Sequence, residues 1–356
     1  MVMTYVKRSA LPALWLACAA MAAPAYAQQT PALLAQFLRQ RIGLSDAQIT
    51  GLEQGQPVVS VLETQKKEDV AVFGIITINQ AREAYVERAQ DLTHFLRTPS
   101  RVAFGVFSRP PTLADVQAVA IDSQDVADLP RCRVGECRLK LPAVVMDEVR
   151  RSVNWNAPDT RAQVNTYARR RLVEYAADYL ARGDSAMVVY DDRGHRDASE
   201  AFASLLAESP YVFQYVPTLH RYLGSYPRGR LDHVTDVLYW SMDAVPSLRP
   251  ILSVNHLTVY SPPELPGTTL FANKQIFADH YFEALFDLTT VIDRPAAPSG
   301  QGIYFLVIRR YRFDRMPSVA MVSLKGKVEG KLKDQLRQDL EHEKRSAEQP
   351  ADPPRD

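Results

Sequence analysis

The apolar residues of this chain alternate with a period of two near both ends and follow helical spacing in the middle. Runs of β-branched and aromatic residues predict four strands, at 58–62, 70–78, 251–260 and 303–313. The clearest helical spacing is in 159–182, which Gly183 is expected to end. Shorter helices are predicted at 31–41, 80–97, 115–121, 142–153 and 199–208.

Two further segments complete the pattern. Residues 318–343 predict a long amphipathic helix, with one apolar stripe that contains Met321, Leu324, Val328, Leu332, Leu336 and Leu340. The segment 210–250 is rich in Pro, Tyr and Arg, and we expect short helices and turns there. Within it, the run 237–241 is expected to pack in the core, with the wall of a ligand cavity as the alternative.

The segment 272–292 allows two interpretations. Its even positions from Ile276 to Ile292 are mostly apolar, and its odd positions are mostly polar, which favours one long strand. The alternative is a helix, because Phe277, Tyr281, Leu285 and Leu288 would share a helical face. We predict the strand.

These elements predict an α+β protein, in which an antiparallel sheet packs against a long C-terminal helix beside a mainly helical middle region. We divide the chain into the N-terminal part of the α+β domain at 28–130, a middle region at 131–250, and C-terminal strands with the long helix at 251–344. The middle region is either an insertion or a separate domain. Residues 345–356 are charged and rich in Pro, and we expect a disordered tail.

The first residues have the pattern of a secretory signal peptide. Two basic residues at 7–8 precede an apolar run at 11–22, and small residues occupy both peptidase positions in 25–27. The run is shorter than the about 20 residues that a membrane-spanning helix needs. We therefore expect cleavage of 1–27, a mature chain that begins at Gln28, and export to the periplasm. A lipoprotein signal acylated at Cys18 is the less favoured alternative, because Trp15 stands where a small or branched aliphatic residue is expected.

The charge balance argues against a nucleic-acid partner. The formal charge is +1, and removal of Lys7 and Arg8 with the signal peptide changes it to −1. A protein that binds nucleic acid is expected to carry a basic face. After 1–27, no stretch is long and apolar enough to predict a transmembrane segment.

Cys132 and Cys137 are the two cysteines of the mature chain, and we predict a disulfide between them. Disulfides persist in the periplasm. No His or Cys lies nearby to complete a zinc site, and the spacing differs from the CxxC of redox enzymes. Gly135 suits a tight turn between them. Closing so short a loop should stabilise the fold by about 2 kcal/mol.

No common catalytic motif is present, such as GxSxG, HExxH or a phosphate-binding Gly-rich loop. We predict no metal site and no cofactor. Two histidines draw attention, because His256 and His280 both lie on apolar faces of predicted strands and could point into one interior. They are either core histidines bonded to neighbours or contacts to a ligand.

Several charged side chains also need an explanation. Arg309 is expected to be partly buried and to pair with a carboxylate on the preceding segment, at Asp279, Glu283 or Asp287. Asp314 is expected to hold Arg312 locally.

Two polar segments are expected to be solvated. The basic face at 325–337 is predicted to face solvent, with contact to anionic lipid as the alternative. His195 beside Asp191 and Asp192 is predicted to lie in a surface turn.

The order of strands followed by a long C-terminal helix resembles the helix-grip, or START-like, superfamily. The resemblance covers 57–97 and 251–343 and depends on element order alone, so it transfers no functional residue. It implies an antiparallel sheet wrapped around the C-terminal helix, with an apolar or lipid-like ligand in a cavity between them.

We therefore predict a soluble periplasmic protein that binds an apolar, lipid-like small molecule between sheet and helix. The expected cavity-wall residues are His256, Tyr260, His280 and Phe282, with Arg310 near the mouth. One alternative is a hydrolytic enzyme of the periplasm that uses a histidine as general base. The other is a non-catalytic interaction module with an exposed apolar patch.

Overall fold

The computed structural model describes residues 32–349, except 93–95, 99, 245–247, 296, 298–300, 316, 317, 320 and 321. The predicted signal peptide and the end of the predicted tail lie outside the described residues.

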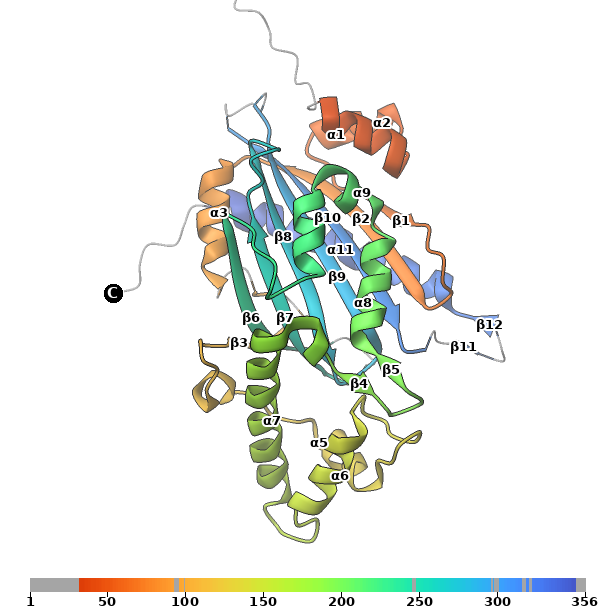
Figure 1. Ribbon diagram of the computed structural model, residues 1–356. Helices are drawn as coiled ribbons and strands as arrows, with labels where there is room; N and C mark the ends of the chain where they lie inside the picture. Colours follow the sequence, from red (N-terminus) through yellow and green to blue (C-terminus); the bar gives the residue numbers. More distant parts are fainter. Residues whose placement is uncertain are drawn as a thin grey trace, which may run out of the picture.

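An eight-stranded antiparallel sheet organises the molecule (Figure 1). Its strand order is β1-β2-β10-β9-β8-β7-β6-β3, so strands from both ends of the chain share one sheet. The strands are β1 (Val58–Leu62), β2 (Asp69–Ile78), β3 (Arg101–Val106), β6 (Val234–Asp243), β7 (Ile251–Tyr260), β8 (Thr268–Ala278), β9 (Phe282–Asp293) and β10 (Ile303–Phe313). The last strand, β10, lies between β2 and β9 and thereby joins the N-terminal part of the chain to the C-terminal part.

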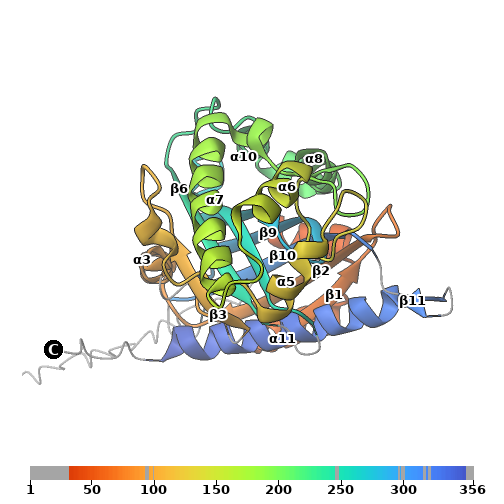
Figure 2. The same cartoon turned by 90° about the horizontal axis from the view of Figure 1, so that it is seen from below.

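One face of the sheet is covered by the long C-terminal helix α11 (Lys325–Glu348), with α3 (Arg82–Gln90) beside it (Figure 2). Leu336 and Leu340 of α11 are completely buried against this face. They pack where β2 carries Gly74, whose missing Cβ leaves room, because a Cβ there would lie 2.8 Å from Leu340. The predicted α+β class, with an antiparallel sheet packed by a long C-terminal helix, is confirmed.

The other face of the sheet is covered by helices from the N-terminus and the middle region (Figure 1). These are α1 (Ala32–Phe37), α7 (Thr160–Arg182), α8 (Ala198–Ala207), α9 (Pro210–Tyr215) and α10 (Pro217–Leu223). Helix α2 (Asp46–Glu53) lies beside α1, whereas α5 (Ser123–Asp128) and α6 (Ala143–Ser152) extend past one end of the sheet. Buried residues of the middle helices, such as Tyr179 and Phe202, form one cluster with Val254 and Phe286 of the sheet.

The prediction of one long strand at 272–292 is wrong in one respect, because the segment forms two strands joined by a tight turn. β8 and β9 pair antiparallel, with Ala272 opposite Leu288, and the chain reverses at residues 279–281. Tyr281 has a positive φ of 62° there. Even positions pair with even positions across the hairpin, so the apolar alternation continues through the turn.

The segment 210–250 differs more from its prediction, because it contains strand β6 as well as short helices. Strand β3 was also not predicted. The C-terminal helix begins at Lys325 rather than at 318, and it continues to Glu348, beyond the expected start of the tail. Residues Ser318–Val319 pair instead with Val322–Ser323.

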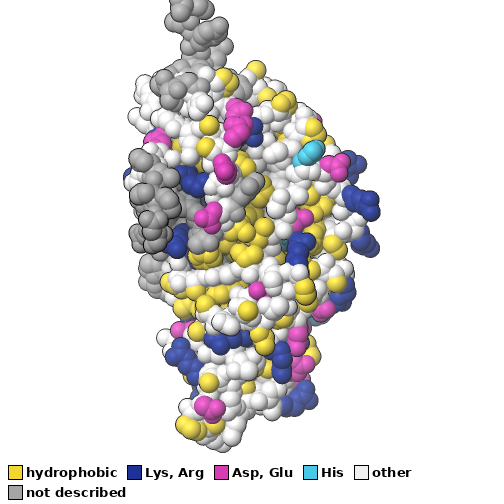
Figure 3. Space-filling model, turned by 90° about the vertical axis from the view of Figure 1, so that its left-hand side faces the viewer, with side chains coloured by type: hydrophobic (Ala, Val, Ile, Leu, Met, Phe, Trp, Pro, Cys, Tyr) yellow, Lys and Arg dark blue, Asp and Glu magenta, His cyan; other side chains and the backbone are white. Residues whose placement is uncertain are grey.

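Figure 3 shows one side of the molecule, on which apolar side chains gather in the middle and charged side chains of both signs are interspersed around them. This side therefore carries no continuous basic face. Among the described residues, no helix has the length and hydropathy to cross a bilayer.

Candidate functional site

His256 is a core histidine whose two ring nitrogens are both bonded to protein groups. It is 2 % exposed, and its Nδ1 lies 2.9 Å from the Tyr179 hydroxyl, while its Nε2 lies 2.9 Å from Asp236. Burial lowers the pKa of His256, although the hydrogen bond with Asp236 opposes this. Burial alone would raise the pKa of Asp236, but hydrogen bonds from His256, Tyr222 and Thr258 hold it below its ordinary value. A neutral His256 that accepts from Tyr179 and donates to ionised Asp236 satisfies every partner, so neither nitrogen remains for a substrate or a metal.

His280 lies elsewhere, in the turn after β8. Its Nε2 is 3.0 Å from Asp125 of α5, and Arg249 bonds the same carboxylate. Asp279, beside it, accepts a hydrogen bond from the backbone N–H of Leu252, four residues before His256 on β7. Those four residues of extended chain separate Leu252 from His256 by about 13 Å, and His280 lies near the Leu252 end. The structure therefore does not bring the two rings into one interior.

Asp125, Asp279 and His280 have donor atoms within 4.8 Å of one another, and all three are buried. The guanidinium of Arg249 is bound to Asp125 and lies 2.8 Å from Asp128. It therefore already supplies positive charge at the place where a cation would have to bind. We interpret the group as an ion-pair cluster.

Tyr260 and Phe282 point to opposite faces of the sheet. The Tyr260 hydroxyl lies 3.3 Å from Thr218 of α10, so Tyr260 faces the middle helices. Phe282 packs against the rings of Tyr311 and Phe313 on the face that α11 covers. With the two histidines, they occupy four separate environments rather than one cavity wall.

Arg310 lies next to an apolar cavity of about 270 Å³ between α1, α9 and the sheet. Aliphatic and aromatic side chains make up almost all of its lining, which consists of Leu33, Leu34, Phe37, Tyr211, Val212, Tyr215, Val216, Leu265, Pro266, Thr268, Leu270, Leu288, Thr290, Ile292, Leu306 and Ile308. Leu33 is 45 % exposed, so the cavity reaches the surface beside α1. Ile308 lies on its floor, and Arg310 is the next residue on the same face of β10.

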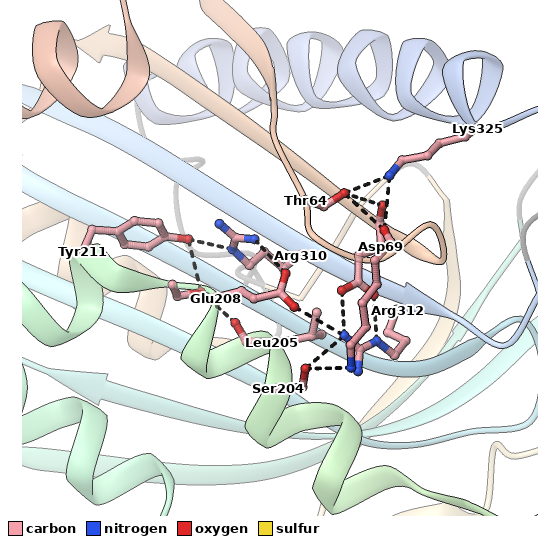
Figure 4. A network of polar contacts seen from close by, with 11 residues as sticks. Thr64, Asp69, Ser204, Leu205, Glu208, Tyr211, Arg310, Arg312 and Lys325 are labelled. Atoms are coloured by element: carbon pink, nitrogen blue, oxygen red, sulfur yellow. Dashed lines mark hydrogen bonds and ion pairs between the residues drawn. The ribbon is translucent and has the colours of Figure 1, made fainter.

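A buried network of polar side chains surrounds Arg310, and Figure 4 shows its guanidinium between the Tyr211 hydroxyl and the Glu208 carboxylate. Nε of Arg310 donates a hydrogen bond of 3.1 Å to Tyr211, a residue of the cavity lining. Nη1 lies 4.0 Å from Glu208, which is too long for a hydrogen bond. Arg310 is 5 % exposed, and among the described residues the bond to Tyr211 is the one hydrogen bond that its guanidinium makes.

Glu208 is the second incompletely bonded member of this network. One of its carboxylate oxygens is buried and has no hydrogen-bond partner among the described residues. The other oxygen lies 3.7 Å from Arg312. Arg310 and Glu208 therefore both have unused hydrogen-bonding capacity beside the apolar cavity.

Arg312 is bound to a carboxylate, but not to its predicted partner. The expected pairing with Asp314 is wrong, because Arg312 forms a two-point ion pair with Asp69, with distances of 2.7 and 2.6 Å. The reason is register, since Arg312 lies directly opposite Asp69 in the ladder between β10 and β2. The prediction for Arg309 is confirmed, because its Nε lies 2.7 Å from Asp287.

A smaller cavity of about 150 Å³ lies between the sheet and α11, where the helix-grip resemblance implies a ligand. Its buried and half-buried ionisable side chains are already paired: Arg309 with Asp287 and Asp339, Arg101 with Asp243, and Tyr85 with Glu343. The other Arg and His side chains of the lining, Arg97 and His342, are exposed. None of the described buried atoms that lack a partner belongs to its lining. Among the described residues, the buried part of this lining therefore has no unpaired charged group that would orient a ligand.

The remaining sequence predictions concern structural or solvated groups. Cys132 and Cys137 are joined, with an S–S distance of 2.03 Å, and Gly135 between them has a φ of 80°. The exposed side chain of His195 lies 3.2 Å from Asp191 in a surface turn. In the run 237–241, Leu238 to Trp240 are buried, as predicted for core residues, and Tyr239 also lines the cavity beneath α11. On the basic face of α11, Lys327, Lys331 and Arg337 are exposed, whereas Lys325 donates a hydrogen bond to Thr64.

Sequence reasoning missed Glu208 and Tyr211, which complete the surroundings of Arg310. The signal available was a single acidic residue between the apolar end of one predicted helix and an aromatic segment, in ESPYVFQY. Comparison with known proteins adds no assignment: no family model matches the chain, and neither a curated protein nor a solved structure shows significant similarity to it.

Proposed function

We propose that the protein binds an apolar, lipid-like ligand with one polar end in the cavity between α1, α9 and the sheet. The observation that carries the proposal is the position of Arg310, a buried guanidinium with unused N–H donors at the end of an apolar cavity. Buried charged groups are normally surrounded by hydrogen-bond partners, so the unused donors of Arg310 favour a ligand atom that accepts hydrogen bonds. The proposal keeps the ligand class that the helix-grip resemblance implies but uses the opposite face of the sheet.

The two incompletely bonded groups define the polar end of the ligand. Arg310 can only donate hydrogen bonds, and ionised Glu208 can only accept them. A carboxyl or hydroxyl group at the end of an alkyl chain accepts from Arg310, and its O–H, when present, donates to Glu208. The alkyl chain would lie on the floor formed by Leu288, Leu306 and Ile308. Export to the periplasm is part of the proposal, supported by the pattern of residues 1–27.

Native mass spectrometry of the mature protein from its own periplasm, followed by organic extraction, tests the ligand class. We expect an apolar adduct on the wild type and none on Thr290→Phe, which fills the cavity from β9. Val102→Phe makes the same kind of change at a position that is 63 % exposed and serves as the control. An adduct of equal abundance on the wild type and Thr290→Phe contradicts the cavity.

Calorimetric titration of delipidated protein with dodecanoic acid and dodecanol tests the polar end. Arg310→Gln should lower the affinity for dodecanoic acid by at least about tenfold, because it removes a hydrogen-bond donor that carries a full charge. Thr290→Phe should lower the affinity for both ligands. If Arg310→Gln binds dodecanoic acid as the wild type does, Arg310 has no part in recognition.

A further inference from the structure

A second cavity, of about 310 Å³, lies at the other end of the sheet among α6, α7 and residues 186–189. Its walls are mainly aliphatic, with contributions from Leu139, Leu141, Val145, Val149, Val164, Leu172, Met187 and Leu252. An apolar cavity of about half this volume is known to hold benzene. No residue of this cavity lines the one beside Arg310, so an inference about it is independent of the proposed function.

The charged lining of this cavity is predominantly acidic. Asp279 and Asp178 contribute carboxyl groups. Arg171 is the basic residue of the lining, and it is bound to Glu174 at 2.6 Å and lies 3.8 Å from Glu148. Its positive charge is therefore balanced by residues of α6 and α7. Asp178 is bound to Arg182 at 3.0 Å, so Asp279 is the carboxyl group of the lining that remains for a ligand.

Asp279 is the buried polar group of the lining, at 6 % exposed. One carboxyl oxygen accepts a hydrogen bond of 2.8 Å from the backbone N–H of Leu252. Among the described residues, no side chain donates a hydrogen bond to this carboxyl group. Burial in these apolar surroundings raises the pKa of Asp279 to about 7, although the charge of His280 opposes the increase.

Aromatic rings complete the chemistry of the site. Tyr167, Tyr175 and Phe277 line the cavity, and the rings of Tyr175 and Phe277 lie edge to face at 6.1 Å. Aromatic faces attract organic cations, and the attraction grows when water is excluded. A carboxylate, aromatic faces and aliphatic walls are together the features that recognise an apolar ammonium group.

We propose that this cavity is a binding site for a small apolar organic cation, an alkyl or aryl ammonium, with Asp279 as its counter-ion. The charged and titratable groups around Asp279 come from every neighbouring element: Asp125 of α5, His280 of the turn, Arg249 before β7, Lys140 and Tyr190 beside the strand end, and Arg171 and Asp178 of α7. Asp125 is paired with Arg249 and His280, whereas Asp279 forms no ion pair within 4.0 Å among the described residues, although the charge of His280 acts on it from nearby.

The pH dependence follows from the protonation state that binds. The cation binds ionised Asp279, so its affinity should be nearly full at about pH 8 and should fall as protonation of Asp279 competes, by up to about tenfold per pH unit well below the pKa. A quaternary ammonium probe does not titrate, so any change with pH belongs to the protein.

The experiment is a calorimetric titration with benzyltrimethylammonium and with neopentylbenzene, its neutral isostere. We expect the cation to bind more tightly than the isostere at about pH 8 and to lose affinity at about pH 5.5. Asp279→Asn should lower the affinity for the cation by at least about tenfold and leave the affinity for the isostere unchanged, because it removes the charge of the side chain and keeps its shape. Equal affinity for both probes, or cation binding unaffected by Asp279→Asn, overturns the proposal.

A second variant keeps the test decisive if Asp279→Asn does not fold. Ala168→Leu narrows the cavity from α7, and Ala162→Leu places the same side chain on the exposed side of that helix. Ala168→Leu should abolish binding of both probes, while Ala162→Leu should bind them as the wild type does. Cation binding that survives in Ala168→Leu shows that the cation binds elsewhere and refutes the site.

Discussion

Arg310 and Arg312 lie two residues apart on the same face of β10, yet their replacement by leucine should have different consequences. Arg312 is bound at two points to Asp69, a residue that is completely buried. Arg312→Leu leaves that carboxylate without its counter-ion, and breaking a buried pair in this way costs about 3–5 kcal/mol. We therefore expect Arg312→Leu to be close to unfolding.

Arg310→Leu should cost much less stability. It removes one hydrogen bond to Tyr211, worth about 1 kcal/mol. The contact with Glu208, at 4.0 Å, is too long to add a strong pair, and Glu208 still has Arg312 at 3.7 Å. A leucine at this position also extends the apolar floor of the cavity. The variant should therefore remain folded while its affinity for dodecanoic acid falls.

The assay is equilibrium unfolding in urea at pH 7, with delipidated protein and with the slope of the transition checked for each variant. The double variant Asp69→Asn with Arg312→Leu serves as a control, because removing both charges should recover part of the loss. If Arg310→Leu loses as much free energy of unfolding as Arg312→Leu, Arg310 is a structural residue. The reasoning that gives it a ligand would then be refuted.

Three further predictions concern the rest of the fold. Burial lowers the pKa of His256, whereas the bond to Asp125 and the charge of Asp279 raise that of His280 against the effect of burial. In thermal unfolding, the wild type should lose stability as the pH falls below about 6.5, and His256→Gln should make this loss smaller. His280→Gln should lower the stability more at about pH 5.5 than at pH 8, because the charged form of His280 is the one that its partners stabilise. Replacing Cys132 and Cys137 by serine should cost about 2 kcal/mol in urea, and a thiol assay of unreduced wild type should find no free thiol. Leu336→Ala should cost about 2–5 kcal/mol in the same assay, and a value near zero would show that α11 does not hold the sheet.

The local patterns of the sequence were sufficient to predict most individual elements. Strands β7 and β10 have the predicted bounds, because each is rich in β-branched and aromatic residues and is flanked by Pro, Gly or polar residues. Helix α7 begins one residue from its predicted start and ends before Gly183, as expected. The spacing of apolar residues encodes these features within a single segment.

The hairpin of β8 and β9 was not predictable by the same means. Its turn contains no Gly or Pro, and it is formed by Asp279, His280 and Tyr281 instead. The alternation remains in phase across it, so the apolar positions of two paired strands read as those of one. Length was the usable signal, because strands rarely exceed about 10 residues.

The sites were less predictable than the elements, because their partners come from distant parts of the chain. The sequence showed that a buried arginine needs a carboxylate, and it indicated Asp287 as one of three candidates for Arg309. The pairing of β9 with β10 places Asp287 directly opposite Arg309. It could not identify Asp69 for Arg312, which is 243 residues away. Sheet register decides such pairs, and register depends on which strands become neighbours.

The cavities on the two faces of the sheet differ in hydrogen bonding as well as in volume, and the hydrogen bonding decides which of them is the better ligand site. Beneath α11, the buried ionisable groups of the cavity lining already bind one another, so a ligand that bound them would have to displace an internal pair. On the opposite face, Arg310 and Glu208 lie too far apart to complete each other's bonds. A buried charge with unused donors destabilises the empty protein. A ligand that supplies the missing acceptor removes this destabilisation when it binds, and its affinity is higher for that reason. The cavity beside Arg310 is therefore the better candidate.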